Sequence, residues 1–241
     1  MRLKTFYLIA VVSYCSAASA QDFPTYNDHI TSGIQEEALD NNALGAAENS
    51  TARSLARLAL ELIKDYEAWI PNAYNDASNY CTVGYGHLVD KWPCDRVRVK
   101  LARFDLPLSP AAGLKLLDTD TGIARATVQR LVTVDLNDEQ FGALSSFVFN
   151  VGASNFESSS LLKFVNNGEF DGAALQFGRW VKSKGVVLNG LINRRSCEAA
   201  LFRGTLSLRS DGRFYRDDCA ALGAAPEDEN LIDIDAGETG R

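Results

Sequence analysis

One short extended region stands between an amphipathic helix and a long run of helical patterns, and this arrangement limits the fold more than any other feature. From about Arg53 to Glu67, apolar side chains recur at helical spacing, which predicts a helix: Leu55, Leu58, Leu62, Ile63 and Tyr66. Ser50 or Thr51 can cap its start, and Pro71 prevents it from continuing far. Residues 72–90 are then typical of strands joined by polar turns.

The rest of the chain predicts further helices. Ser109-Pro110 is a capping residue followed by proline in a first turn. Asn137 and Gln140 have the spacing of a capping box. Other helices are expected near 158–166, 169–181 and 190–202, with the breaks at Gly152, Gly168 and Gly185. The predicted fold class is therefore α+β and mostly α, in one continuous domain over residues 51–222.

The first twenty residues, MRLKTFYLIAVVSYCSAASA, have the pattern of a secretory signal peptide. A basic start at Arg2 and Lys4 precedes an apolar run, and Ala18-Ser19-Ala20 forms a small-residue cleavage site. An uncleaved anchor is the alternative. Since no later segment is apolar for long enough to span a bilayer, we expect export without stable membrane insertion. The mature protein would be extracellular, or periplasmic in a bacterium.

Removal of this leader leaves four cysteines, Cys81, Cys94, Cys197 and Cys219. An even number in an exported chain predicts two disulfides, for which three pairings exist. We expect the local scheme, Cys81–Cys94 and Cys197–Cys219, because each bond then closes a short loop. A zinc site is the competing interpretation, but the sequence has no Cys-x-x-Cys and only two histidines. No metal or other cofactor is therefore expected.

Both flanks of the predicted domain are acidic. Residues 21–50 carry six acids and no Lys or Arg, which predicts an acidic arm or linker, and Asn49 lies in an N-glycosylation sequon. Residues 223–241 predict an acidic, disordered tail. The 21 Lys and Arg of residues 51–225 face 19 Asp and Glu, so this part has a net charge of about +2. No concentrated basic patch indicates a nucleic-acid partner.

The segment YEAWIPNAYNDASNYCTVGYGH, from Tyr66 to His87, holds two carboxylates in different settings. Glycosidic hydrolysis needs an acid for the leaving oxygen and a second carboxylate that supports water attack or the developing cation. Glu67 ends an apolar helix beside Trp69, and apolar surroundings favour a protonated acid. Asp76 lies in a polar turn that keeps it ionised. The Thr82 hydroxyl can hold a water molecule.

The same residues carry a family resemblance. The segment has eight residues between Glu67 and Asp76 and five between Asp76 and Thr82, and Val-Gly-Tyr-Gly-His follows. It resembles the catalytic segment of the phage-type lysozymes, glycoside hydrolase family 24. Tyr74-Asn75-Asp76 is similar to the family's aromatic-x-Asp motif. Residues 136–181 and 190–202, the latter GLINRRSCEAALF, are similar to its helical part, so about 55–205 is covered. Ala68 departs from the glycine that often follows the family's glutamate.

The resemblance implies a two-lobed lysozyme fold, a small β-hairpin lobe and a helical lobe with the substrate cleft between them. Glu67 would be the general acid, Asp76 the second carboxylate and Thr82 the third member. His87 would be structural or line the cleft, and Tyr74 would support the site. Arg194 or Arg195 would pair with Glu67 from the helical lobe. The implied reaction cleaves the β-1,4 bond between N-acetylmuramic acid and N-acetylglucosamine in bacterial peptidoglycan. The protein is expected to act as a monomer.

Two alternatives of other classes stay open at this point. One is a catalytically silent protein that binds peptidoglycan or chitin on the same fold, and the other is a chitinase. The intact set of Glu67, Asp76 and Thr82 favours the muramidase. Trp180 is interpreted as a core residue, although a sugar-stacking role is the alternative for it.

Overall fold

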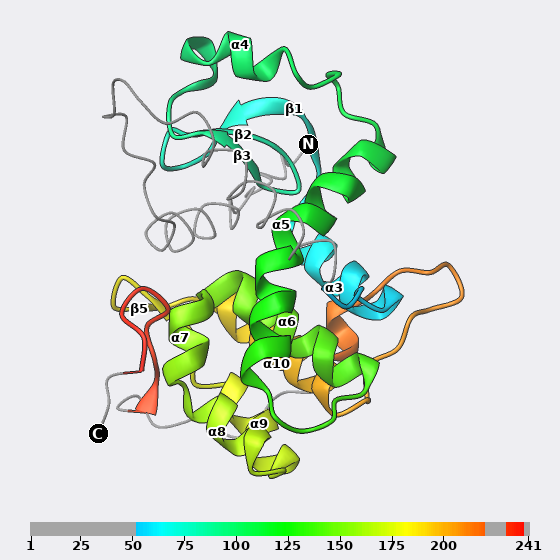
Figure 1. Cartoon of the computed structure of the whole chain (residues 1–241), viewed down its shortest axis with the longest axis vertical. Coiled ribbons are helices and arrows are strands. Elements are labelled where there is room, and N and C mark those ends of the chain that lie inside the picture. The colour runs from blue at the N-terminus through cyan, green and yellow to red at the C-terminus, as the bar shows by residue number, and fades with distance from the viewer. Residues whose placement is uncertain (1–51, 220–229, 239–241) are drawn as a thin grey trace, which may run out of the picture.

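A computed structural model describes residues 52–219 and 230–238. The predicted signal peptide, the acidic arm and the sequon lie outside the described residues. So do the proposed caps Ser50 and Thr51 and part of the acidic tail. Within the described ranges, no helix is long and apolar enough to cross a membrane. The described part forms two lobes joined by helices α3 and α5 (Figure 1).

Helix α3, Arg57–Glu67, starts four residues later than the sequence predicts. The reason is tertiary: the side chain of Arg125 donates to the carbonyl oxygens of Ala52 and Arg53. Those carbonyls would otherwise accept from the first turn of a helix. Leu62 and Ile63 are fully buried on the inner face of α3, as the apolar spacing predicts.

The small lobe contains a three-stranded antiparallel sheet in the order β1-β2-β3. The strands are β1 Ile70–Asn75, β2 Cys81–Gly84 and β3 His87–Asp90. The disulfide Cys81–Cys94 joins β2 to the short helix η2, Cys94–Arg96, and helix α4, Arg98–Leu101, follows. The predicted extended region is thus present, and a covalent bond closes it.

Helix α5, Pro110–Leu131, runs from the small lobe into the helical lobe (Figure 1). The Ser109 side chain accepts from the Ala112 N–H, as its predicted capping role requires. The capping box of Asn137 and Gln140 is present at the start of α6, Asp138–Val151. The lobe continues with α7 Ala153–Ser158, α8 Ser160–Asn166, α9 Phe170–Phe177 and α10 Asn189–Phe202.

Aromatic side chains form the centre of the helical lobe. Phe147 makes edge contacts with Phe156, Phe177 and Trp180, at ring-centroid distances of 6.3, 5.4 and 5.3 Å. Edge-to-face pairs of this kind are a favourable arrangement of the ring quadrupoles. Trp180 is fully buried, which confirms its interpretation as a core residue and leaves it no surface for sugar stacking.

A hairpin after α9 was not expected from the sequence. The predicted helix 169–181 ends at Phe177, and strands β4 Lys182–Ser183 and β5 Val186–Val187 follow. Gly185 has a φ of 78° in the connecting turn, a conformation that glycine adopts without steric cost. The predicted break at Gly185 is therefore a β-turn and not an interruption between helices.

The prediction of a disordered tail is wrong for residues 230–238. Ile232 and Ile234 are 6% and 1% exposed, and the segment bonds to β4 in a parallel bridge between Lys182 and Asp233. The alternation of isoleucine with aspartate explains the error, because one face of the segment is apolar and packs on the lobe. This red segment lies beside β5 in Figure 1.

The second disulfide, Cys197–Cys219, ties α10 to the end of the segment that follows it. That segment includes the short helix η3, Arg216–Asp218, and it returns to α3, where Arg216 pairs with Asp65. Both bonds therefore follow the local pairing expected from the sequence. One lies in each lobe.

Candidate active site

Glu67 is the last residue of α3 and lies where the two lobes meet. Its side chain is 6% exposed, and its Oε1 accepts a hydrogen bond from Nη1 of Arg194 at 2.7 Å. Arg194 is on α10, so this buried ion pair connects the end of α3 to the helical lobe. Of the two candidate arginines, Arg194 is the one that contacts Glu67.

The surroundings of Glu67 are more polar than its place in the sequence indicates. We expected an apolar environment beside Trp69, but the direct partner of the carboxylate is a guanidinium. The Trp69 ring packs on Tyr85, with ring centroids 4.8 Å apart, and against Gly113 on α5, where any side chain would collide with it. Trp69 therefore packs the small lobe onto α5.

Asp76 occupies the turn between β1 and β2. Its Oδ1 accepts from the backbone N–H groups of Ser78 and Tyr80, at 2.8 and 2.9 Å. Its Oδ2 has no hydrogen-bond partner among the residues that the structure describes. An aspartate that bonds to the backbone of its own turn is a common local motif. Here the motif fixes one oxygen, while the other is buried without a hydrogen-bond donor from the described part of the chain.

The Tyr74 phenol interacts electrostatically with both carboxylates. The pKa of its phenol is raised to about 12, first by burial and then by the negative charges of Asp76 and Glu67. Tyr74 is on β1, directly opposite Thr82 on β2. The fold thus brings Glu67, Asp76, Tyr74 and Thr82 into one neighbourhood, as the sequence predicts.

Thr82 is more enclosed than its predicted role suggests. It is 1% exposed, and its hydroxyl donates to the carbonyl oxygen of Tyr80 at 3.3 Å. The hydroxyl oxygen retains its capacity to accept a hydrogen bond. Its part in holding a water molecule stays a prediction.

His87 connects β3 to α5. Its Nδ1 lies 2.9 and 3.0 Å from the two carboxylate oxygens of Asp120, and its ring packs on Phe104 with centroids 5.7 Å apart. These contacts support the structural role expected for His87. Asp120, the partner on α5, was not identified from the sequence.

A buried charge network lies behind Glu67. Nε of Arg194 also donates to Glu198 Oε1 at 3.1 Å, and the Ser146 hydroxyl donates to the same oxygen at 2.7 Å. Arg195 has other partners: its Nη1 lies 3.1 Å from Glu198 Oε2, and its Nη2 donates to Asn150. We call Glu67, Arg194, Glu198 and Arg195 the buried charge network.

Glu198 is a buried charged residue of this neighbourhood that the sequence did not single out. The signal was the order Arg-Arg-x-x-Glu on a helix, which places Glu198 three and four residues after the arginines. Side chains at these spacings meet on a helix surface. Without the fold, such a pattern is equally typical of a solvated helix face.

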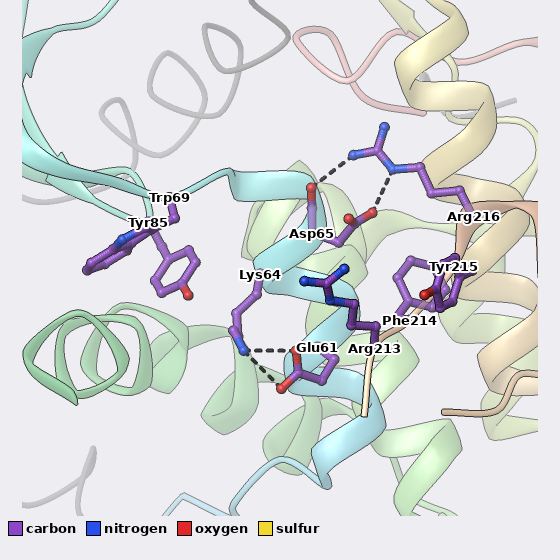
Figure 2. A pocket seen from close by; sticks show the side chains of 9 residues that line it. All are labelled: Glu61, Lys64, Asp65, Trp69, Tyr85, Arg213, Phe214, Tyr215 and Arg216. Atoms are coloured by element: carbon purple, nitrogen blue, oxygen red, sulfur yellow. Dashed lines mark hydrogen bonds and ion pairs between the residues drawn. The ribbon is translucent and has the colours of Figure 1, made fainter. Parts of the chain in front are cut away.

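A pocket of about 660 Å³ lies on the outer face of α3 and does not include the carboxylate pair. Trp69 and Tyr85 form one side, and Tyr215 lies on the other (Figure 2). Between them lie two ion pairs: Lys64–Glu61 is within α3, and Asp65 of α3 pairs with Arg216 of η3. Because neither Glu67 nor Asp76 lines it, we do not assign the reaction to this pocket.

The described residues contain no group of three or more His, Cys, Asp or Glu that could hold a metal ion. Carboxylates, a tyrosine, a threonine and an arginine are the chemical groups that the site offers. Such a set suits proton transfer and the stabilisation of a developing positive charge.

Comparison with known proteins gives a consistent result. The family model described as phage lysozyme matches residues 64–198. The chain is 37% identical over 152 residues to an endolysin of Bacillus phage B103, covering 62% of this chain and 54% of that protein. It is 34% identical over 173 residues to a SAR-endolysin of Escherichia phage Mu, covering 71% and 90%. The chain thus spans about half the length of the Bacillus phage relative.

Solved structures show the same fold. The endolysin from Escherichia coli O157:H7 phage FAHEc1 aligns with a TM-score of 0.56 and 28% identity, covering 65% of this chain and 98% of that one. The muramidase domain of SpmX from Asticaccaulis excentricus aligns with a TM-score of 0.52 and 29% identity, covering 62% and 97%. The prediction of a two-lobed α+β fold is confirmed.

Proposed function

The chain belongs to the phage lysozyme family, and on that premise we propose that it is an N-acetylmuramidase that cleaves the glycan strands of bacterial peptidoglycan. The observation that carries this proposal is the placement of two carboxylates. Glu67 is buried and held by Arg194, whereas Asp76 keeps one oxygen without a protein partner. The same two-carboxylate division of roles operates in most glycoside hydrolases.

In the proposed reaction, Glu67 is the general acid. It donates its proton to the glycosidic oxygen while the bond from the anomeric carbon to that oxygen breaks. Oε1 of Glu67 accepts from Arg194, which holds the carboxyl group in one orientation. The leaving sugar departs as an alcohol, and the positive charge develops on the anomeric carbon.

Asp76 is the second carboxylate in this scheme. Its Oδ2 stabilises the positive charge or receives a proton from the water whose hydroxide adds to the anomeric carbon. The backbone bonds to Oδ1 keep the carboxylate in one orientation during this step. Thr82 and Tyr74 support the position of water and substrate, and His87 keeps β3 on α5.

We further propose that the protein is exported and acts as a monomer on the cell wall. The leader over residues 1–20 and the two disulfides support export, because disulfides persist in oxidising compartments. The proposed catalytic domain comprises residues 51–222 and, in addition, the docked segment 230–238. N-terminal sequencing of the mature protein tests the cleavage after Ala20.

Clearing of a bacterial wall suspension tests the activity. We expect the turbidity to fall with the wild-type protein and to stay constant with Glu67→Gln. Binding to walls without clearing by the wild type would favour the silent binding protein. Release of oligomers from chitin, with no clearing of walls, would favour the chitinase.

A further inference from the structure

Glu198 is a fully buried carboxylate that the proposed reaction does not use. It lies on α10, is 0% exposed, and shares Arg194 with Glu67. The four members of the buried charge network are all at most 6% exposed, and their two positive and two negative charges balance. A buried charge is costly unless it is paired, so this balance constrains every member.

The guanidinium of Arg194 is held at all three of its nitrogens. Nη1 donates to Glu67 at 2.7 Å, Nε donates to Glu198 at 3.1 Å, and Nη2 donates to the Ser146 carbonyl oxygen at 3.4 Å. The two carboxylates therefore divide one positive charge between them. Charge-assisted hydrogen bonds of this kind fix orientation as well as contributing energy.

We propose that Glu198 is a positioning residue for Glu67, acting through Arg194. This inference rests on the proposed function, in which Glu67 must carry a proton. Glu198 also accepts from Arg194, so the guanidinium is fixed between the two carboxylates and orients Glu67. If the negative charge of Glu198 were lost, the positive charge of Arg194 would act on Glu67 alone and would favour its charged form more strongly.

The groups that face these two carboxylates come from four elements. Glu67 faces Arg194 of α10 and interacts electrostatically with Tyr74 of β1. Glu198 faces Arg194, Arg195 and, from α6, the Ser146 hydroxyl. The Tyr66 phenol of α3 also interacts electrostatically with Glu198. The pKa of Tyr66 is raised chiefly by burial, and the charge of Glu198 adds to this effect.

The test is the pH dependence of peptidoglycan cleavage. Glu198→Gln keeps the size of the side chain and removes its charge. We expect the alkaline limb of its pH–activity profile to move to lower pH by about one unit, which is about a tenfold loss at a pH on that limb. Glu198→Asp keeps the charge and should restore the position of the limb.

Ser146→Ala provides a variant with an opposite expected sign. Loss of the hydroxyl leaves Glu198 Oε1 with one donor fewer. Glu198 then interacts more strongly with Arg194, so Arg194 favours the charged form of Glu67 less. The alkaline limb should move to higher pH, by less than the shift expected for Glu198→Gln. This change removes a single oxygen atom and leaves the charges in place, so the variant should stay folded even if Glu198→Gln does not.

Glu238→Gln is the matched control, because Glu238 also pairs with an arginine of the helical lobe but lies outside the buried charge network. The alkaline limb of the Glu238→Gln profile should coincide with that of the wild type. A shift found for Glu198→Gln would then be specific to the buried charge network. The inference is overturned if Glu198→Gln or Ser146→Ala keeps the wild-type limb, or if both move it in one direction. An active Glu67→Gln would overturn the proposed function itself.

Discussion

At the scale of single residues, Glu67 and Asp76 are held differently, and each substitution has its own expected effect. Glu67→Gln retains an oxygen that can accept from Arg194, so the fold and wall binding should persist. The amide has no acidic proton to transfer to the glycosidic oxygen, and activity should fall by a factor of about 10²–10⁴. Wall clearing and wall co-sedimentation measure the two properties. Turnover at the wild-type rate would refute the assignment of Glu67.

Asp76→Asn should also remove most of the activity. The asparagine oxygen can accept the N–H groups of Ser78 and Tyr80, so the turn should keep its shape. The neutral amide no longer carries the negative charge that supports the developing cation. Thermal melting checks the fold and wall clearing checks the reaction. A silent Asp76→Asn would show that Glu67 works without this second carboxylate.

Ala68, directly after Glu67, occupies an unfavourable backbone conformation with φ 57° and ψ 160°. Residues other than glycine rarely adopt it, at a cost of about 1–3 kcal/mol. Glycine would relieve this strain but lose more freedom on folding, by about 0.4–1 kcal/mol. We therefore expect Ala68→Gly to raise the free energy of unfolding by about 1 kcal/mol, measured by urea denaturation. Ala111→Gly, in an ordinary helix, should instead lower it.

At the scale of elements, the segment 230–238 is attached through Glu238. Its carboxylate accepts from the Ser160 N–H and from Arg179, both at 2.7 Å. Burial acts to raise the pKa of Glu238, but the Ser160 N–H and the Arg179 guanidinium together hold it below its ordinary value of 4.5. Docking thus favours the charged form.

The sign of the pH effect follows from this lowered pKa. The contribution of Glu238 to stability is complete above about pH 4.5 and is lost as the pH falls through the lower value of the folded state. Below that range, the backbone N–H groups of Gly185 and Ile234 should exchange faster, once intrinsic rates are subtracted. Glu238→Gln should exchange faster already at pH 7 and lose this pH dependence. Constant protection of both groups down to pH 3 would contradict the role of Glu238.

At the scale of the whole molecule, each lobe has its own disulfide, with sequence separations of 13 and 22. Each should contribute about 3 kcal/mol on the chain-entropy model. Replacing either pair by serine should lower the melting temperature. Replacing Cys81 and Cys94 should reduce activity more, because Cys81 precedes Thr82 on β2. Equal loss of activity from both paired variants would contradict this local effect. Peptide mapping without reductant verifies the pairing.

The sequence by itself determined the features that depend on short-range order. Helical spacing, the cap at Ser109 and the capping box at Asn137 act within one or two turns, and each predicted element is present. The spacing of Glu67, Asp76 and Thr82 identified the family because these residues lie within sixteen positions of one another. The local disulfide pairing was expected because each bond closes a short loop, but the sequence allowed two other schemes, and the structure has the local one.

Only the tertiary structure decided which distant groups meet. Successive residues on a helix point about 100° apart, so the position of α10 against α3 directs Arg194 toward Glu67 and Arg195 toward Asn150. The burial of Glu198 depends on Ser146 of α6, 52 positions away. The docking of Ile234 depends on β4, which pairs with the segment 230–238 from far earlier in the chain. Packing between elements far apart in the chain therefore assigned these partners.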